Sequence, residues 1–135
     1  MTPEFWQCNV ETEITVSTED FLKFADLTGD DAPHHIDSLL AQSMGYKESL
    51  GQGLLILSLT GKASSKYLEL IHRKGVTYGY ERLRFPSPVY NGDSLTITYE
   101  PESISEKSVV SSRITVRTSS GDVALAGTHL LKILD

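Results

Sequence analysis

The chain has 135 residues, 39% of them hydrophobic and 22% charged, and its formal net charge is −6. This length and composition are typical of one globular domain, so we expect residues 1–135 to form a single domain with a real core. The acidic balance argues against nucleic acid as a partner, because phosphate binding favours a basic surface. It leaves an anionic small molecule open as a ligand.

Cysteine content and hydropathy limit the remaining classes. Cys8 is the only cysteine, which excludes an intramolecular disulfide. No apolar run approaches the ~20 residues that span a bilayer, and residues 1–7 lack the pattern of a signal peptide. The histidines show no metal-ligand spacing. We therefore expect a cytoplasmic enzyme or binding module with no metal, no cofactor and no membrane contact.

The first elements are predicted to be a strand and a helix. Apolar residues at even spacing predict a strand that includes Val10, Ile14 and Val16. Ser17 or Thr18 then offers an N-cap, and Asp20 completes a capping box with Ser17. Gly29 is a suitable C-terminal cap for this helix. Pro33 prevents the helix from continuing, because proline lacks an amide donor and restricts the residue before it.

Two more helices are expected before the pattern changes. Asp37 is a good N-cap for a short helix that ends near Met44. The main helix is predicted to begin near Gly53, to run for roughly 20 residues and to be stopped by Gly75. Its first turns are apolar on all sides and should be buried, namely Leu54, Leu55, Ile56 and Leu57.

After Gly75 the apolar period changes to two, which predicts four consecutive strands. The first changes face near Glu81, so we expect a bulge there, and Asn91–Asp93 is typical of a turn. The later strands are centred on residues 95–99, 110–116 and 123–133. Consecutive strands with short connections favour an antiparallel sheet. We predict an α+β fold in which this sheet wraps around one long central helix, the hotdog architecture.

The segment 28–37 carries the most chemical information. Asp30 and His35 lie five residues apart across a turn that contains Pro33, so both side chains could reach one pocket. Histidine exchanges protons near neutral pH, and a carboxylate beside it could orient the ring or share a water molecule with it. From spacing alone such a pair is more often structural than catalytic, so both interpretations stay open at this point.

Three blocks of sequence, in order along the chain, match the pattern of a known family. The first, S/T-G-D-x-N-P-x-H-x-D, is met at Thr28, Gly29, Asp30, Pro33, His35 and Asp37. The second continues through Ala41, Tyr46, Leu50, Gly53 and Leu54. The third, L-R-F-x-x-P-V-x-x-G-D-x-L, is met at Leu83, Arg84, Phe85, Pro88, Val89, Gly92, Asp93 and Leu95. Over about residues 21–95 the chain resembles the MaoC-like dehydratase and (R)-specific enoyl-CoA hydratase family.

The resemblance implies a hydro-lyase of fatty acid or polyketide metabolism. It would hydrate a 2-enoyl thioester, or dehydrate a 3-hydroxyacyl thioester, of coenzyme A or acyl carrier protein. Asp30 and His35 would be the catalytic pair and would hold one water between them, while the Gly53 amide would stabilise the charge on the thioester oxygen. The expected substrate-binding residues are Pro33, Gln52, Leu54 and Arg84. Members usually pair through their sheets, so a homodimer is expected.

Two residues depart from the family pattern, and both concern the site. Ala32 stands where the pattern has Asn, and Gln52 stands where it has His. These departures motivate one alternative, a hotdog module that binds an acyl group or a partner without catalysis. A hotdog thioesterase is another. Among the remaining histidines, His34 is expected to be an exposed neighbour of His35, His72 a helix C-cap and His129 a satisfied sheet residue.

Overall fold

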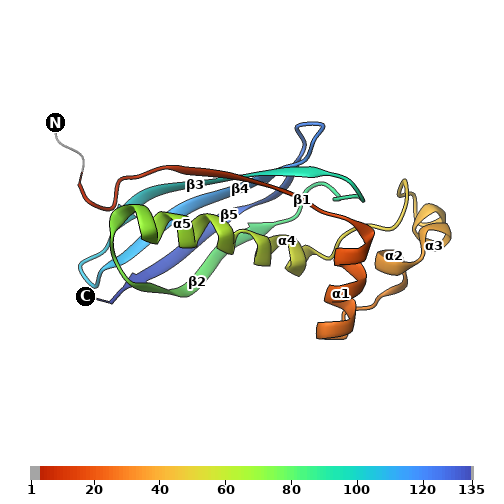
Figure 1. The fold of residues 1–135 in the computed structure, drawn as a ribbon, viewed down its shortest axis with the longest axis horizontal. Coiled ribbons are helices and arrows are strands. Elements are labelled where there is room, and N and C mark those ends of the chain that lie inside the picture. The colour runs from red at the N-terminus through yellow and green to blue at the C-terminus, as the bar shows by residue number, and fades with distance from the viewer. Residues whose placement is uncertain (1–3, 135) are drawn as a thin grey trace.

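A computed structural model of the chain describes residues 4–134. Residues 1–3 and 135 lie outside the described residues. They include the start of the segment expected to lack a signal-peptide pattern and the last residue of the expected domain. Mixed helices and strands follow in the predicted order (Figure 1). The elements are β1 (Val10–Thr15), α1 (Thr18–Thr28), α2 (Pro33–Ile36), α3 (Ser38–Ser43), α4 (Gly53–Leu59), α5 (Gly61–Ile71), β2 (Gly75–Arg84), β3 (Ser94–Ile104), β4 (Val109–Arg117) and β5 (Val123–Ile133).

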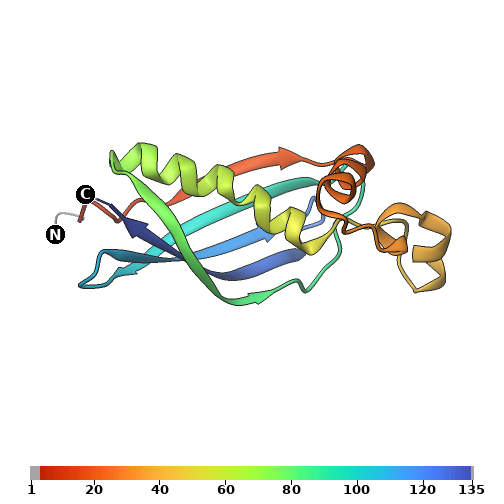
Figure 2. The same ribbon diagram turned by 90° about the horizontal axis from the view of Figure 1, so that it is seen from below.

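All five strands form one antiparallel sheet in the order β1-β3-β4-β5-β2. Helices α4 and α5 run across one face of this sheet, and α1 to α3 gather at one end of it (Figure 2). The core lies between the two layers, where α5 packs with the inward faces of the strands; its fully buried members include Tyr67, Leu95, Ile97, Tyr99, Ile114 and Leu125. The predicted α+β fold is confirmed.

Helix α1 has the ends that the sequence predicts. The Ser17 hydroxyl accepts from the Asp20 amide, and the Asp20 carboxylate accepts from the Ser17 amide at 2.9 Å, which completes the capping box. Gly29 ends the helix in the left-handed conformation, with φ of 77°, and its amide donates to the Ala25 carbonyl. This sharp end turns the chain directly into the segment that carries Asp30.

Helix α2 is an element that the sequence pattern does not predict. The sequence pattern predicts that Pro33 ends a helix, but this proline also occupies the first turn of a new four-residue helix. Proline suits that position, because its fixed φ is helical and its missing amide would have no partner there. Ala32 is the N-cap and supplies no side-chain bond. Asp37 then caps α3 as predicted, by accepting from the amides of Leu39 and Leu40.

The predicted long helix is two helices end to end, α4 and α5, separated at Thr60. The Thr60 amide and hydroxyl both donate to the Leu57 carbonyl, which tightens the turn locally. The helix ends at His72, which adopts φ of 56°, so Gly75 does not stop it. Gly75 begins β2 instead, where a Cβ would lie 2.9 Å from the Lys132 carbonyl oxygen. Among residues 4–134, no helix is both long and apolar enough to cross a bilayer.

Strand β2 is irregular where the sequence predicts it. Its register against β5 shifts between Thr77 and Gly79 and again between Glu81 and Arg84, and Arg82 adopts φ of 55°. The second irregularity confirms the expected bulge near Glu81. The strand pairs with β5 again at Arg84, and the connection that follows it contributes residues 85–89 to the lining of a pocket.

His129 in β5 is a buried sheet residue, as predicted, and both of its ring nitrogens have partners. Nδ1 lies 2.8 Å from the Tyr99 hydroxyl and Nε2 lies 3.0 Å from the Thr77 hydroxyl. Burial lowers the pKa of His129 from 6.5 to about 4, because a charged ring would lose its hydration. The native protein therefore holds this ring neutral at pH values where the unfolded chain protonates it.

This burial makes stability depend on pH. The folded pKa of His129 is below the unfolded one, so the unfolded state binds more protons between pH 6.5 and 4 and stability falls as the pH falls. We expect the wild type to lose about 2 kcal/mol more between pH 7 and pH 5 than His129→Gln, which cannot titrate. Urea unfolding of both proteins at the two pH values measures the difference. Equal losses would contradict this assignment.

Candidate active site

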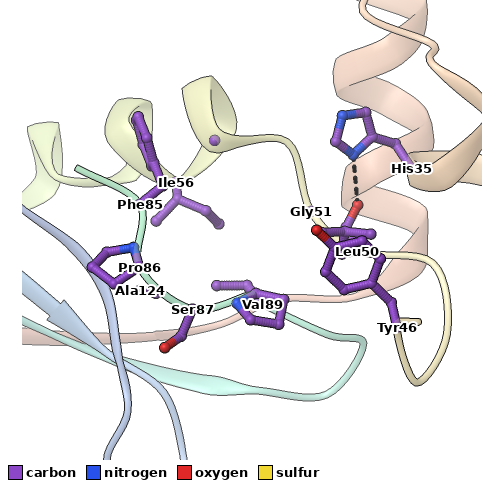
Figure 3. A pocket seen from close by; sticks show the side chains of 12 residues that line it. His35, Tyr46, Leu50, Gly51, Ile56, Phe85, Pro86, Ser87, Val89 and Ala124 are labelled. Carbon is purple, nitrogen blue, oxygen red and sulfur yellow. Dashed lines mark hydrogen bonds between the residues drawn. The ribbon is translucent and has the colours of Figure 1, made fainter. Parts of the chain in front are cut away.

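A pocket lies beside the start of α4, between the helices at the end of the sheet and the β2–β3 connection. His35 and Tyr46 stand on one side of it, and Phe85 and Pro86 on the other (Figure 3). Its lining residues are His35, Tyr46, Leu50, Gly51, Gly53, Ile56, Phe85, Pro86, Ser87, Pro88, Val89 and Ala124. Four separate parts of the sequence thus meet around one cavity.

The chain between α3 and α4 is held on both sides, and it forms one wall of the pocket. The Leu50 amide donates to the His34 carbonyl at 3.1 Å, and the Gly51 amide donates to the Val89 carbonyl at 2.8 Å. These main-chain bonds connect α2 on one side with the β2–β3 connection on the other. The position of His35 relative to the pocket is therefore determined by the backbone.

His35 is only 8% exposed, and one hydrogen bond determines how its ring is used. Nδ1 lies 2.8 Å from the Leu50 carbonyl oxygen, as the dashed line in Figure 3 marks. A carbonyl oxygen only accepts, so Nδ1 carries the hydrogen and Nε2 of the neutral ring has a free lone pair. Nε2 lies 4.0 Å from Oδ1 of Asp30. The nitrogen that can accept a proton therefore faces the carboxylate.

Asp30 follows the α1 C-cap, and its amide donates to the Thr28 hydroxyl at 3.1 Å. Its side chain is 38% exposed, so solvent reaches the carboxylate from one side. The 4.0 Å gap to His35 is too long for a direct hydrogen bond, but one oxygen atom could contact both groups. The structure thus places the side chains of Asp30 and His35, the two predicted catalytic residues, close enough for one atom to contact both.

His34 is half-buried, in contrast to the exposed neighbour expected from the sequence. Its ring centroid lies 4.0 Å from that of His35, with the planes tilted by 52°. Burial lowers the pKa of His34, and repulsion from a protonated His35 lowers it further, while Asp30 acts in the opposite direction. His34 therefore tends to stay neutral.

Two glycines allow the start of α4 to approach its neighbours closely. A Cβ on Gly51 would lie 2.9 Å from the Phe21 ring, and a Cβ on Gly53 would lie 3.2 Å from the Phe85 ring. Gly53 lines the pocket, and as the first residue of α4 its amide has no acceptor within the helix. The missing side chain leaves room for the Phe85 ring against the first turn of α4.

Gln52 is completely buried, and it is not one of the residues that line the pocket. Its side-chain amide Nε2 donates to the carbonyls of Phe21, at 2.9 Å, and Asp30, at 3.2 Å. The expected role of Gln52 in substrate binding stays a prediction, and in this structure its side chain contacts backbone carbonyls behind the pocket. Burial followed from its position between two glycines that pack against aromatic rings, which the local sequence pattern does not reveal.

Three other expected substrate-binding residues lie outside the pocket lining. Leu54 is 59% exposed on the outer face of α4, so the predicted burial of that whole turn is wrong; Leu55 and Ile56 alone are buried. Pro33 is exposed at the start of α2, and exposed Arg84 donates to the Leu83 carbonyl. Within residues 4–134, no group of three His, Cys, Asp or Glu is placed to hold a metal.

Several residues that line the pocket have no role predicted from the sequence. Tyr46, Leu50, Phe85 and Val89 belong to the blocks that match the family pattern, so those matches were an available signal. Ile56 and Ala124 reach the pocket only through the packing of α4 against β5. No local pattern could have identified these two.

Comparison with known protein families gives one match that covers most of the chain. The family described as the MaoC like domain matches residues 7–123. The blocks quoted above and the whole pocket, apart from Ala124, fall within this range.

Individual relatives agree with that match. The chain is 31% identical over 114 residues to an (R)-specific enoyl-CoA hydratase of Rhodospirillum rubrum, which covers 84% of this chain and 76% of the relative. It is 31% identical over 90 residues to a mitochondrial 3-hydroxyacyl-[acyl-carrier-protein] dehydratase of Solanum lycopersicum, covering 67% of this chain and 52% of the relative. The chain thus spans roughly half to three fifths of the length of the first curated relatives.

Solved structures agree on the fold. An (R)-hydratase from A. caviae, described as involved in PHA biosynthesis, superimposes with a TM-score of 0.84. The match covers 95% of this chain and 96% of that one at 22% identity, which is a likeness of fold. The hotdog architecture expected from the sequence is confirmed.

Proposed function

The chain belongs to the family of MaoC-like domains, and from that premise we propose that it is a hydro-lyase acting on a thioester. The reaction would add water across the double bond of a 2-enoyl thioester, or remove it from a 3-hydroxyacyl thioester. The acyl group would be carried by coenzyme A or by an acyl carrier protein, as the names of the relatives suggest. The observation that carries the proposal is the lone pair of His35 Nε2 facing Asp30 beside the pocket.

The proposed reaction centre is the space between these two groups. An oxygen atom about 2.8 Å from each would fit beside the 4.0 Å gap, and we assign this position to the attacking water. In hydration, the water oxygen bonds to C3 while one of its protons passes to the pair. The pair returns a proton to C2 as the double bond is lost. Dehydration is the reverse sequence.

The Gly53 amide would stabilise the negative charge that develops on the thioester oxygen. As C3 is attacked, electrons of the double bond shift toward the thioester oxygen, and this oxygen needs a hydrogen-bond donor. The Gly53 amide lines the pocket and has no acceptor within α4. Loss of one such donor typically raises the barrier by about 2.7–4 kcal/mol. The neighbouring Phe85 ring covers the glycine and would shield this interaction from water.

One observation favours a second candidate, an acyl-binding module without catalysis. Ala32 leaves α2 without the side-chain cap that the Asn of the family pattern could supply, and α2 carries His35. A less firmly held α2 would retain the pocket while losing turnover. The experiment below separates this candidate, and also a thioesterase, from the hydro-lyase.

We expect Asp30→Asn and His35→Gln each to lower kcat by roughly 100-fold or more, because each removes one member of the proton-exchanging pair. Asp31→Asn is the matched control, since Asp31 is an exposed carboxylate next to Asp30, and it should keep kcat within about twofold of the wild type. Loss of the enoyl absorbance of crotonyl-CoA and of longer and carrier-bound enoyl thioesters measures the activity.

The same assay distinguishes the alternatives. Binding without turnover of any of these thioesters would favour the acyl-binding module. Release of free thiol from acyl-CoA would favour a thioesterase. Full activity of Asp30→Asn would exclude the proposed pair even if the wild type hydrates its substrate.

We further propose that the protein is a homodimer that pairs through β2. This strand is an edge of the sheet, so one side of its backbone has no neighbouring strand among the described residues. Its exposed side chains are partly apolar, with Tyr78 70% exposed and Val76 51% exposed. A long edge of this kind is a template for pairing with another chain, and two-fold pairing is the commonest assembly of soluble proteins.

Sedimentation should therefore give a species of twice the chain mass. Tyr78→Asp should shift the protein toward monomer at equal concentration, because it places charge in the proposed interface. Leu70→Asp is a suitable control, since it alters an exposed apolar residue on α5, and it should leave the dimer intact. A wild type that sediments only as a monomer would overturn this proposal.

A further inference from the structure

The side chain of Gln52 connects three parts of the protein that meet behind the pocket. Gln52 is the last residue before α4. Its side-chain amide donates to the Phe21 carbonyl in α1 and to the Asp30 carbonyl in the loop after α1. One buried group thus bonds to the backbone of Asp30, while its own backbone continues directly into Gly53.

The chemistry of these contacts specifies an amide. Both partners are carbonyl oxygens, which only accept, so the side chain must supply two donors from one atom. The NH₂ group of glutamine does this. A neutral histidine ring offers one N–H, and an ionised glutamate offers none. The arrangement therefore fits the residue that this chain has, and it does not fit the histidine of the family pattern equally well.

The oxygen of the Gln52 side-chain amide shows that this arrangement costs free energy. The Gln52 Oε1 atom is buried and has no hydrogen-bond partner among the described residues. A buried acceptor without a donor is unfavourable and uncommon. The side chain remains in this position because its Nε2 makes both carbonyl contacts there. An apolar residue of similar length would avoid the unpaired oxygen but would lose both contacts.

We propose that Gln52 is a positioning residue, which holds the Asp30 loop against the start of α4 through its two carbonyl contacts. This inference rests on the proposed function, in which the Asp30 carboxylate and the Gly53 amide act on opposite ends of one enoyl group. The two groups belong to different elements, and Gln52 bonds to the backbone of one and precedes the other in sequence. It touches no substrate and acts through Asp30 and Gly53.

The test compares Gln52→Met with Tyr67→Phe. Gln52→Met keeps the length of the side chain and removes both donors. Tyr67→Phe removes another fully buried side-chain bond to a carbonyl, from the Tyr67 hydroxyl to Trp6, away from the pocket. With crotonyl-CoA we expect Gln52→Met to lower kcat about tenfold or more, with KM within about twofold, because misplaced reacting groups slow chemistry more than binding. Tyr67→Phe should retain the wild-type kcat at a temperature where all three proteins are folded.

Hydrogen exchange provides a readout that needs no activity. In Gln52→Met, amides of residues 29–35 and 53–55 should exchange faster, while those of β4 should be unchanged. An unchanged exchange pattern would overturn the inference even in an active enzyme. So would wild-type kcat in Gln52→Met, a rise in KM alone, or equal losses of kcat in both variants. If the wild type hydrates no thioester, the proposed function fails, whereas the exchange result still decides whether Gln52 holds the two segments.

Discussion

The hydrogen bond between His35 Nδ1 and the Leu50 carbonyl is the constraint on which the site depends. It determines the tautomer of the neutral ring and directs the basic nitrogen toward Asp30. Leu50 can hold the ring because its own amide is bonded to the His34 carbonyl. Residues 34–35 and residue 50 therefore contact each other twice, once through the backbone and once through the side chain. Without this pairing, the ring would be free to present either nitrogen.

The second constraint on the site is that the backbone at the start of α4 passes close to two aromatic rings. Gly51 lets the chain pass against Phe21 in α1, and Gly53 lets the first turn of α4 pass against Phe85. Phe85 itself directly follows Arg84, the last residue of β2, just after the register shift in that strand. The start of the helix, the end of a strand and the first helix thus meet within one region because two positions lack a side chain. The buried Gln52 lies between these two positions.

Much of this structure could be predicted from the sequence where local chemistry decides it. The capping box at Ser17, the left-handed Gly29, the cap at Asp37 and the period of two after residue 75 each correspond to an observed feature. The errors arose where tertiary packing decides. Pro33 breaks one helix and also starts another, and Leu54 is apolar yet faces outward because α4 covers the sheet with only one of its faces. The proximity of Asp30 and His35 agrees with the sequence expectation, while their role stays a proposal.

The tautomer of His35 is the most direct test of this account. Nitrogen-15 NMR distinguishes a protonated from an unprotonated imidazole nitrogen, and His35→Gln identifies the signals of His35 among the four histidines. In the neutral ring, we predict a protonated Nδ1 and an unprotonated Nε2. A ring that carries its hydrogen on Nε2 would have no lone pair facing Asp30, and it would contradict the central claim.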